Sequence, residues 1–111
     1  MGRTSNRNEK QSKSKFRDFM KKIILIIYDP TLDSDILRDR IKSLGSNYTF
    51  WKNHWFVETI HTAKEVYEKI SVNEFESNSI LVIEMSKESA KSYYGRMNTS
   101  LWDWLKDKTT K

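Results

Sequence analysis

Few side chains in this sequence belong to the types that catalyse reactions or bind metals. There is no cysteine, which excludes disulfides, thiolate zinc sites and thiol nucleophiles. His54 and His61 are seven residues apart and there is no third histidine, so a zinc site is not predicted. His54 is more often an ordinary hairpin residue in such a position, and it is also a candidate acid–base residue for RNA chemistry near neutral pH.

The motifs that mark common enzyme classes are also absent. The sequence has no Walker loop, no Gly-x-Gly-x-x-Gly, no nucleophile elbow and no His-Glu-x-x-His. Nucleotide hydrolysis, redox chemistry with a nucleotide cofactor and zinc proteolysis therefore have no support. No catalytic residue is assigned, and the sequence leaves both an enzyme and a binding protein open.

Basic residues are concentrated at the N-terminus. The chain has 111 residues and a net charge of +5. Residues 1–22 hold eight basic and two acidic residues, a balance of +6, whereas residues 23–111 hold twelve basic and thirteen acidic residues, a balance of −1. A basic segment of this kind favours an acidic partner such as nucleic acid. The candidate nucleic-acid-binding residues are Arg3, Arg7, Lys10, Lys13, Lys15, Arg17, Lys21 and Lys22.

The same segment is too polar to form a core. Residues 1–15 contain one hydrophobic residue, Met1, so we predict a disordered basic tail over residues 1–19 and one domain over residues 20–111. The tail has no apolar region of a signal peptide, and no apolar run of about 18 residues occurs anywhere. We therefore expect a cytoplasmic protein without a membrane span.

Hydrophobic periodicity predicts the elements that position the candidate residues. Residues 23–28 form an apolar, β-branched run and predict a strand. Apolar residues at spacings of four and three predict a helix over residues 31–44. Asp33 or Ser34 is suited to cap the start of this helix, and Gly45 is placed as its C-terminal glycine.

The remaining pattern predicts a hairpin, a helix, a strand and a last helix. The hairpin strands are expected at residues 47–52 and 54–60, followed by a helix with a Thr62–Glu65 capping box and a strand at 79–85. A last helix is expected to begin at Thr99 or Ser100.

This order of elements predicts an α+β, ferredoxin-like βαββαβ domain with an antiparallel sheet in the order 4-1-3-2. Both main helices are expected on one face of the sheet, and the last helix on the other. Within the last helix, the spacing places Leu101, Trp104 and Leu105 on the domain and Trp102 at the helix edge, available to a partner.

Both faces of the predicted sheet are apolar, although the two main helices cover only one. In the first strand, both alternating sets of side chains are apolar. Residues 80–85 are equally apolar and lie on an edge strand, which is an aggregation hazard unless it is paired. We therefore predict a homodimer; the alternative is a monomer whose last helix folds across the sheet.

Aromatic residues crowd the predicted hairpin. They have two interpretations, as large side chains of a small core or as a platform that stacks unpaired bases of RNA. Strand alternation should bury about half of them. The residues are Tyr48, Phe50, Trp51, Trp55 and Phe56, with Lys52 among them.

Several segments of the chain resemble the SinR-like family of small bacterial proteins. They are Ile-Ile-Leu-Ile-Ile-Tyr-Asp-Pro at residues 23–30, Trp-Phe-Val-Glu-Thr at 55–59, Ser-Ile-Leu-Val-Ile-Glu-Met-Ser at 79–86 and Trp-Leu-Lys at 104–106. That family is similar in turn to the small CRISPR-associated ferredoxin-like subunit and to VapD-type ribonuclease toxins. Those relatives often end in a strand that pairs with the partner's sheet, where this chain has a predicted helix.

The resemblance implies a role for Asp29, the acidic residue after the first strand. In the CRISPR-associated relatives this acid from each protomer faces the other across the dimer axis, and in some members it holds a divalent metal such as Mg²⁺ or Mn²⁺ for phosphodiester cleavage. Asp33 and Asp35 are the nearest further carboxylates. An aspartate before a proline is also an ordinary turn residue, and acidic residues are common at a helix start.

Together these observations predict a nucleic-acid-associated dimer that either binds nucleic acid or cleaves it weakly with a divalent metal. The alternative, from another class, is a non-catalytic dimeric protein-interaction module.

Overall fold

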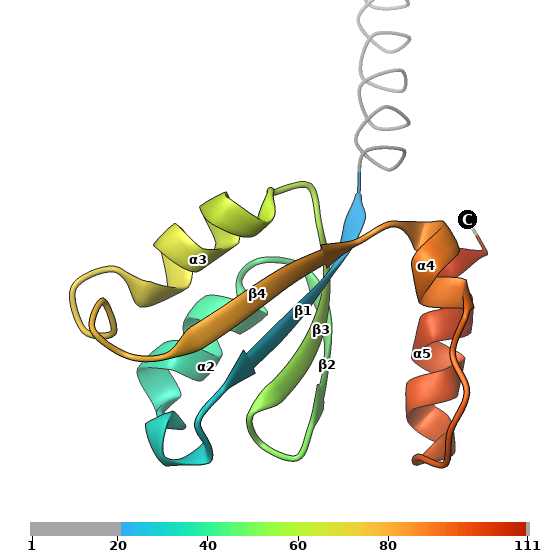
Figure 1. Ribbon diagram of the computed structural model, residues 1–111, viewed down its shortest axis with the longest axis horizontal. Helices are drawn as coiled ribbons and strands as arrows, with labels where there is room; N and C mark the ends of the chain where they lie inside the picture. The colour runs from blue at the N-terminus through green and yellow to red at the C-terminus, as the bar shows by residue number, and fades with distance from the viewer. Residues whose placement is uncertain (1–20, 111) are drawn as a thin grey trace, which may run out of the picture.

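Four antiparallel strands form the central layer of the structure, a computed structural model that describes residues 21–110 (Figure 1). The strands are β1 (Lys22–Tyr28), β2 (Ser46–Phe50), β3 (His54–Thr59) and β4 (Ile80–Met85). Their order across the sheet is β2-β3-β1-β4, which reads 4-1-3-2 from the β4 edge. The predicted tail over residues 1–19 lies outside the described residues.

Helices lie on both sides of the sheet (Figure 1). Helices α2 (Asp35–Lys42) and α3 (Ala63–Ser71) lie on one side, whereas α4 (Lys87–Lys91) and α5 (Thr99–Thr109) lie on the other. The protein is therefore α+β, and α5 is the predicted C-terminal helix. In the part of the chain that the structure describes, no helix is both long and apolar enough to cross a membrane.

The main core lies between the sheet and helices α2 and α3. Alternate residues of β1 and β3 point into this layer, because successive side chains of a strand face opposite sides. The predicted alternation of β3 is confirmed, since Trp55 and Val57 are fully buried there. The buried cluster consists of Ile24, Ile26, Tyr28, Leu37, Ile41, Trp55, Val57, Val66, Ile70 and Phe75.

The helix predicted over residues 31–44 is shorter and interrupted. A single 3₁₀ turn, η1 (Pro30–Leu32), comes first, and Ser34 then adopts an extended conformation before α2 begins at Asp35. The Ser34 side chain accepts a hydrogen bond from the Leu37 backbone N–H at 3.2 Å, which makes it the cap. The break arises because Asp29 and Ser34 each cap a separate turn.

Two further details differ from the sequence prediction. The hairpin turn is formed by residues 51–53, so β2 ends at Phe50 instead of Lys52. The short helix α4 was not predicted, because it buries only Ala90 and so has no apolar stripe. The capping box of α3 is confirmed, with Thr62 and Glu65 bonded reciprocally.

Candidate functional site

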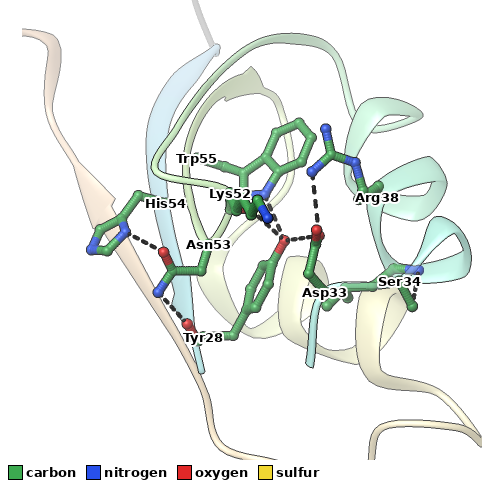
Figure 2. Close-up of polar contacts among 9 residues, drawn as sticks. Tyr28, Asp33, Ser34, Arg38, Lys52, Asn53, His54 and Trp55 are labelled. Carbon is green, nitrogen blue, oxygen red and sulfur yellow. Dashed lines mark hydrogen bonds and ion pairs between the residues drawn. The ribbon is translucent and has the colours of Figure 1, made fainter. Parts of the chain in front are cut away.

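A polar network links the end of β1 to the β2–β3 turn and the start of α2 (Figure 2). The Tyr28 hydroxyl accepts a hydrogen bond from the Trp55 indole Nε1 at 2.9 Å and donates one to the Lys52 carbonyl at 3.1 Å. Burial raises the pKa of Tyr28 above its usual range, and the Trp55 hydrogen bond opposes this. The phenol is therefore neutral at physiological pH, where it fastens the turn to the strand.

Asp33 belongs to the same network and is occupied by protein partners. Its Oδ1 accepts from the Arg38 guanidinium at 3.3 Å and lies 3.5 Å from the Tyr28 hydroxyl. The Arg38 guanidinium also lies 5.3 Å from the centre of the Trp55 ring. Asp33 therefore has a structural role that joins η1, α2 and the core (Figure 2).

His54 is held by its neighbour Asn53 (Figure 2). The Asn53 side-chain nitrogen donates to the Tyr28 carbonyl at 2.7 Å, which leaves the amide oxygen, 3.0 Å from His54 Nδ1, as an acceptor. Neutral His54 therefore carries its proton on Nδ1, and Nε2 is left as an acceptor. Nε2 in this state can accept a proton and so act as a base. The sequence predicts no second catalytic group beside the imidazole.

Asp29 is exposed and forms the turn that its sequence position indicates. Its Oδ1 accepts from the Thr31 backbone N–H at 2.9 Å and from the Thr31 hydroxyl at 2.8 Å. The backbone hydrogen bond, followed by the hydroxyl bond, lowers the pKa of Asp29 below its usual range. The carboxylate is thus ionised at neutral pH, and both hydrogen bonds leave Oδ2 available.

A shallow cavity of about 550 Å³ lies beside Asp29, between the end of β1 and the start of β4. Its polar lining comes from Asp29, Asn78 and Ser79, and its apolar lining includes Ile27 and Leu81. Within residues 21–110, no group of three or more His, Cys, Asp or Glu side chains is placed to hold a metal ion. A metal at Asp29 would therefore need ligands from elsewhere, such as a second protomer.

The aromatic residues of the hairpin divide between core and surface. Trp55 is fully buried, and Phe56 stacks on Trp104 of α5 at a centroid distance of 6.1 Å. Phe50 and His54 are half-buried, and their rings contact Trp51, which is 67% exposed. The core interpretation holds for Trp55, whereas the base-stacking interpretation of the exposed residues stays a prediction.

The last helix, α5, covers one part of the sheet face that lies opposite α2 and α3. Leu101 and Leu105 are buried as predicted, and Trp104 packs on the domain through Phe56. Trp102 is half-buried and stacks on Tyr93 at a centroid distance of 4.9 Å with nearly parallel rings, so one face of its indole is covered within the chain.

A buried carboxylate fixes the position of both C-terminal helices. The Glu58 side chain is 9% exposed and lies 3.7 Å from Lys87 of α4 and 3.9 Å from Lys108 of α5. This contact sits at the β3 end that pairs with the start of β1, so α4 and α5 are held over that end of the sheet.

The rest of this face carries aliphatic side chains that α5 does not cover. The strand register arranges the side chains of this face in two rows that run across the sheet. The first row is Phe50, His54, Ile27 and Leu81. The second row is Tyr48, Phe56, Leu25 and Ile83. Leu81 is 53% exposed and Ile83 39% exposed, although both lie in the middle of a strand. We refer to Leu25, Ile27, Leu81 and Ile83 as the aliphatic patch.

Of the predicted nucleic-acid-binding residues, Lys21 and Lys22 are within the described range. Lys22 is half-buried and forms an ion pair with Glu84 of β4 at 3.1 Å. Arg3, Arg7, Lys10, Lys13, Lys15 and Arg17 lie outside it.

Comparison with protein-family models, curated proteins and solved structures finds no match for this chain. The roles that the SinR-like resemblance implies therefore stay predictions, and the geometry of the chain itself carries the functional argument.

Proposed function

We propose that this chain is a homodimeric interaction protein of the cytoplasm, in which a second copy of the chain covers the aliphatic patch. The observation that carries the proposal is the exposure of Leu81 and Ile83 on a sheet face that α5 covers only in part. Full burial of such a side chain is worth roughly 1.5–3 kcal/mol, and leaving about half of each one in water forgoes a corresponding part of that gain. A partner on this face recovers that free energy.

Three features favour a second copy over an unrelated partner. The two rows of the face contain no Lys, Arg, Asp or Glu, so two identical faces do not repel each other. Residues 21–110 hold thirteen basic and thirteen acidic residues, so the described part has no net charge. The patch also reaches β4, an edge strand of the described sheet, where a two-fold axis can bring identical strands together.

The proposal is tested by placing a charge in the patch. Leu81→Lys should shift sedimentation of the full chain from dimer to monomer, because a lysine buried in the interface would lose its hydration. Ile36→Lys is the matched control, since Ile36 is 51% exposed on α2, away from the patch. A Leu81→Lys protein that sediments like the Ile36→Lys protein would contradict the proposal.

The order of elements and strands supports a ferredoxin-like assignment for the domain. The sequence β1, α2, β2, β3, α3, β4 has the βαββαβ succession, with η1, α4 and α5 as additions. We propose this assignment together with the relationship to the SinR-like family.

A second candidate function is nucleic-acid association through a metal at Asp29, as the resemblance implies. The favouring observation is the exposed, ionised carboxylate with Oδ2 available, beside a cavity that also borders the patch residues Ile27 and Leu81. A second protomer that placed its own Asp29 at this cavity would add a ligand. Mg²⁺ or Mn²⁺ held there would polarise a phosphate of DNA or RNA.

This candidate predicts that Mg²⁺ or Mn²⁺ raises the melting temperature of the native chain but not that of Asp29→Asn. Preferential binding worth 1 kcal/mol would raise it by about 4–8 °C. Asp39→Asn is the control, because Asp39 is exposed on α2 and is not one of the candidate metal ligands. An equal metal effect in the native and Asp29→Asn proteins would assign the metal to another site, and no effect in either would leave Asp29 as a turn residue.

A further inference from the structure

The tip of the β2–β3 hairpin has a backbone conformation that its residue types do not favour. Trp51 and Lys52 have φ angles of 54° and 59°, in the left-handed region. That region suits glycine and asparagine, whereas for other L-residues it costs roughly 1–2 kcal/mol. A tryptophan there is an outlier whose presence needs a compensating gain.

Packing of the Trp51 side chain does not supply that gain. Trp51 leaves 67% of its surface exposed, so burial stabilises it little. Its ring contacts Phe50 and His54 edge-on, with centroid distances of 5.5 Å to each. These contacts orient the indole without covering it.

The hairpin tip also packs against a chain of stacked aromatic rings. Phe50 stacks on Phe56 at 5.5 Å, and Phe56 stacks in turn on Trp104 of α5. The turn itself is fastened to the core, because the Lys52 carbonyl accepts from the buried Tyr28 hydroxyl (Figure 2). The exposed indole is therefore held on a rigid base, which reduces the entropy that a ligand would cost on binding.

We propose that the hairpin tip binds an unpaired base of single-stranded nucleic acid, which stacks on the Trp51 indole. Base–aromatic stacking uses an exposed ring face of this kind and is tolerant of sequence. Lys52, exposed beside the indole, supplies a cation for the adjoining phosphate, and residues 50–54 contain no acidic side chain that would repel it.

Nucleic acid fits this tip better than a protein partner does. The exposed apolar surface at the tip is one flat ring with a cation next to it, which matches a base and its phosphate. The site is separate from the proposed dimer contact. It lies at the β2–β3 hairpin, whereas the aliphatic patch lies on β1 and β4.

The test compares three single-stranded oligonucleotides of equal length by fluorescence anisotropy with the full chain: RNA, DNA, and an abasic strand that keeps every phosphate. Native protein should bind the base-containing strands more tightly than the abasic strand, and the RNA and DNA arms identify the preferred sugar. Trp51→Asn should weaken binding to the base-containing strands by about 5- to 150-fold, the equivalent of one stacked base. Trp51→Phe, which keeps a ring, should lose less.

Two controls separate binding from folding and assembly. Tyr94→Ala removes a fully exposed aromatic residue from another loop and should leave binding unchanged. Trp51→Asn should melt at or above the native temperature, because asparagine tolerates the left-handed conformation. Equal affinity for abasic strands, no binding to any strand, or unchanged affinity in Trp51→Asn would overturn the proposal, and none of these results depends on whether the chain dimerises.

Discussion

At the scale of single residues, Tyr28 joins more parts of the molecule than any charged side chain of the network. Its ring is in the core, its hydroxyl serves both Trp55 and the turn carbonyl of Lys52, and its own carbonyl accepts from Asn53. Asn53 also contacts His54, so the Tyr28 backbone carbonyl is linked through Asn53 to the imidazole. Tyr28 thus ties β1 to Trp55 and to the β2–β3 turn.

Removing the Tyr28 hydroxyl should lower the free energy of unfolding. Tyr28→Phe leaves the buried Trp55 N–H without its acceptor, and an orphaned buried polar group costs roughly 1–3 kcal/mol. Tyr48→Phe is the matched control, since the Tyr48 hydroxyl bonds to Ser100 near the surface. Chemical denaturation at neutral pH should show a clearly lower free energy of unfolding for Tyr28→Phe than for Tyr48→Phe; equal values would contradict the assigned network.

The same variant has a pH signature. The pKa of Tyr28 is raised in the folded state, so its stabilising contribution is fully present below the unfolded value of about 10 and is lost as the pH rises through the folded pKa. Native protein should therefore lose stability more steeply than Tyr28→Phe as the pH rises above about 10. Parallel pH profiles of the native and Tyr28→Phe proteins would mean that a group other than Tyr28 causes the loss of stability.

At the scale of elements, the link from α2 to β2 depends on a close approach of two backbones. The sequence suggested Gly45 as the glycine that ends the helix, but Ser43 is the C-cap of α2. At Gly45, an added Cβ would lie 2.1 Å from the Glu58 carbonyl oxygen. Gly45 therefore permits β2 to enter the sheet beside β3.

A pair of glycines tests this account. Gly45→Ala should destabilise the protein by more than about 1 kcal/mol, because the clash is with backbone. Gly95 has nearly the same φ, 159° against 157°, and nothing within 4 Å of an added Cβ. Gly95→Ala thus carries the conformational cost without the clash, and similar melting temperatures for the two variants would show that the close approach is unimportant.

The sequence predicts those elements whose signal is local. The apolar run of β1 and the Thr62–Glu65 capping box each appear where expected, because neighbouring residues determine them. The split before α2 and the turn at Trp51 were missed, since competing caps and tertiary contacts decide them. The Tyr28–Trp55 hydrogen bond joins residues far apart in sequence, so no local pattern could reveal it.

At the scale of the whole molecule, the two sheet faces differ in how they are closed. Helices α2 and α3 seal one face over a fully buried core, whereas α4 and α5 close only one part of the other (Figure 1). The sequence indicated two apolar faces, but it could not show how much of the second face a single helix covers. The exposed aliphatic patch and the exposed hairpin tip lie on different strands of the sheet, so the proposed dimer contact and the proposed base-stacking site do not overlap.

The most direct test of this account is the mass of the full chain in solution. Light scattering at micromolar concentration should give about 27 kDa, twice the chain mass of 13.3 kDa, because the aliphatic patch is closed by a second copy. The Leu81→Lys protein should give the mass of one chain under the same conditions. A single species of 13.3 kDa for the native chain across the micromolar range would contradict the account.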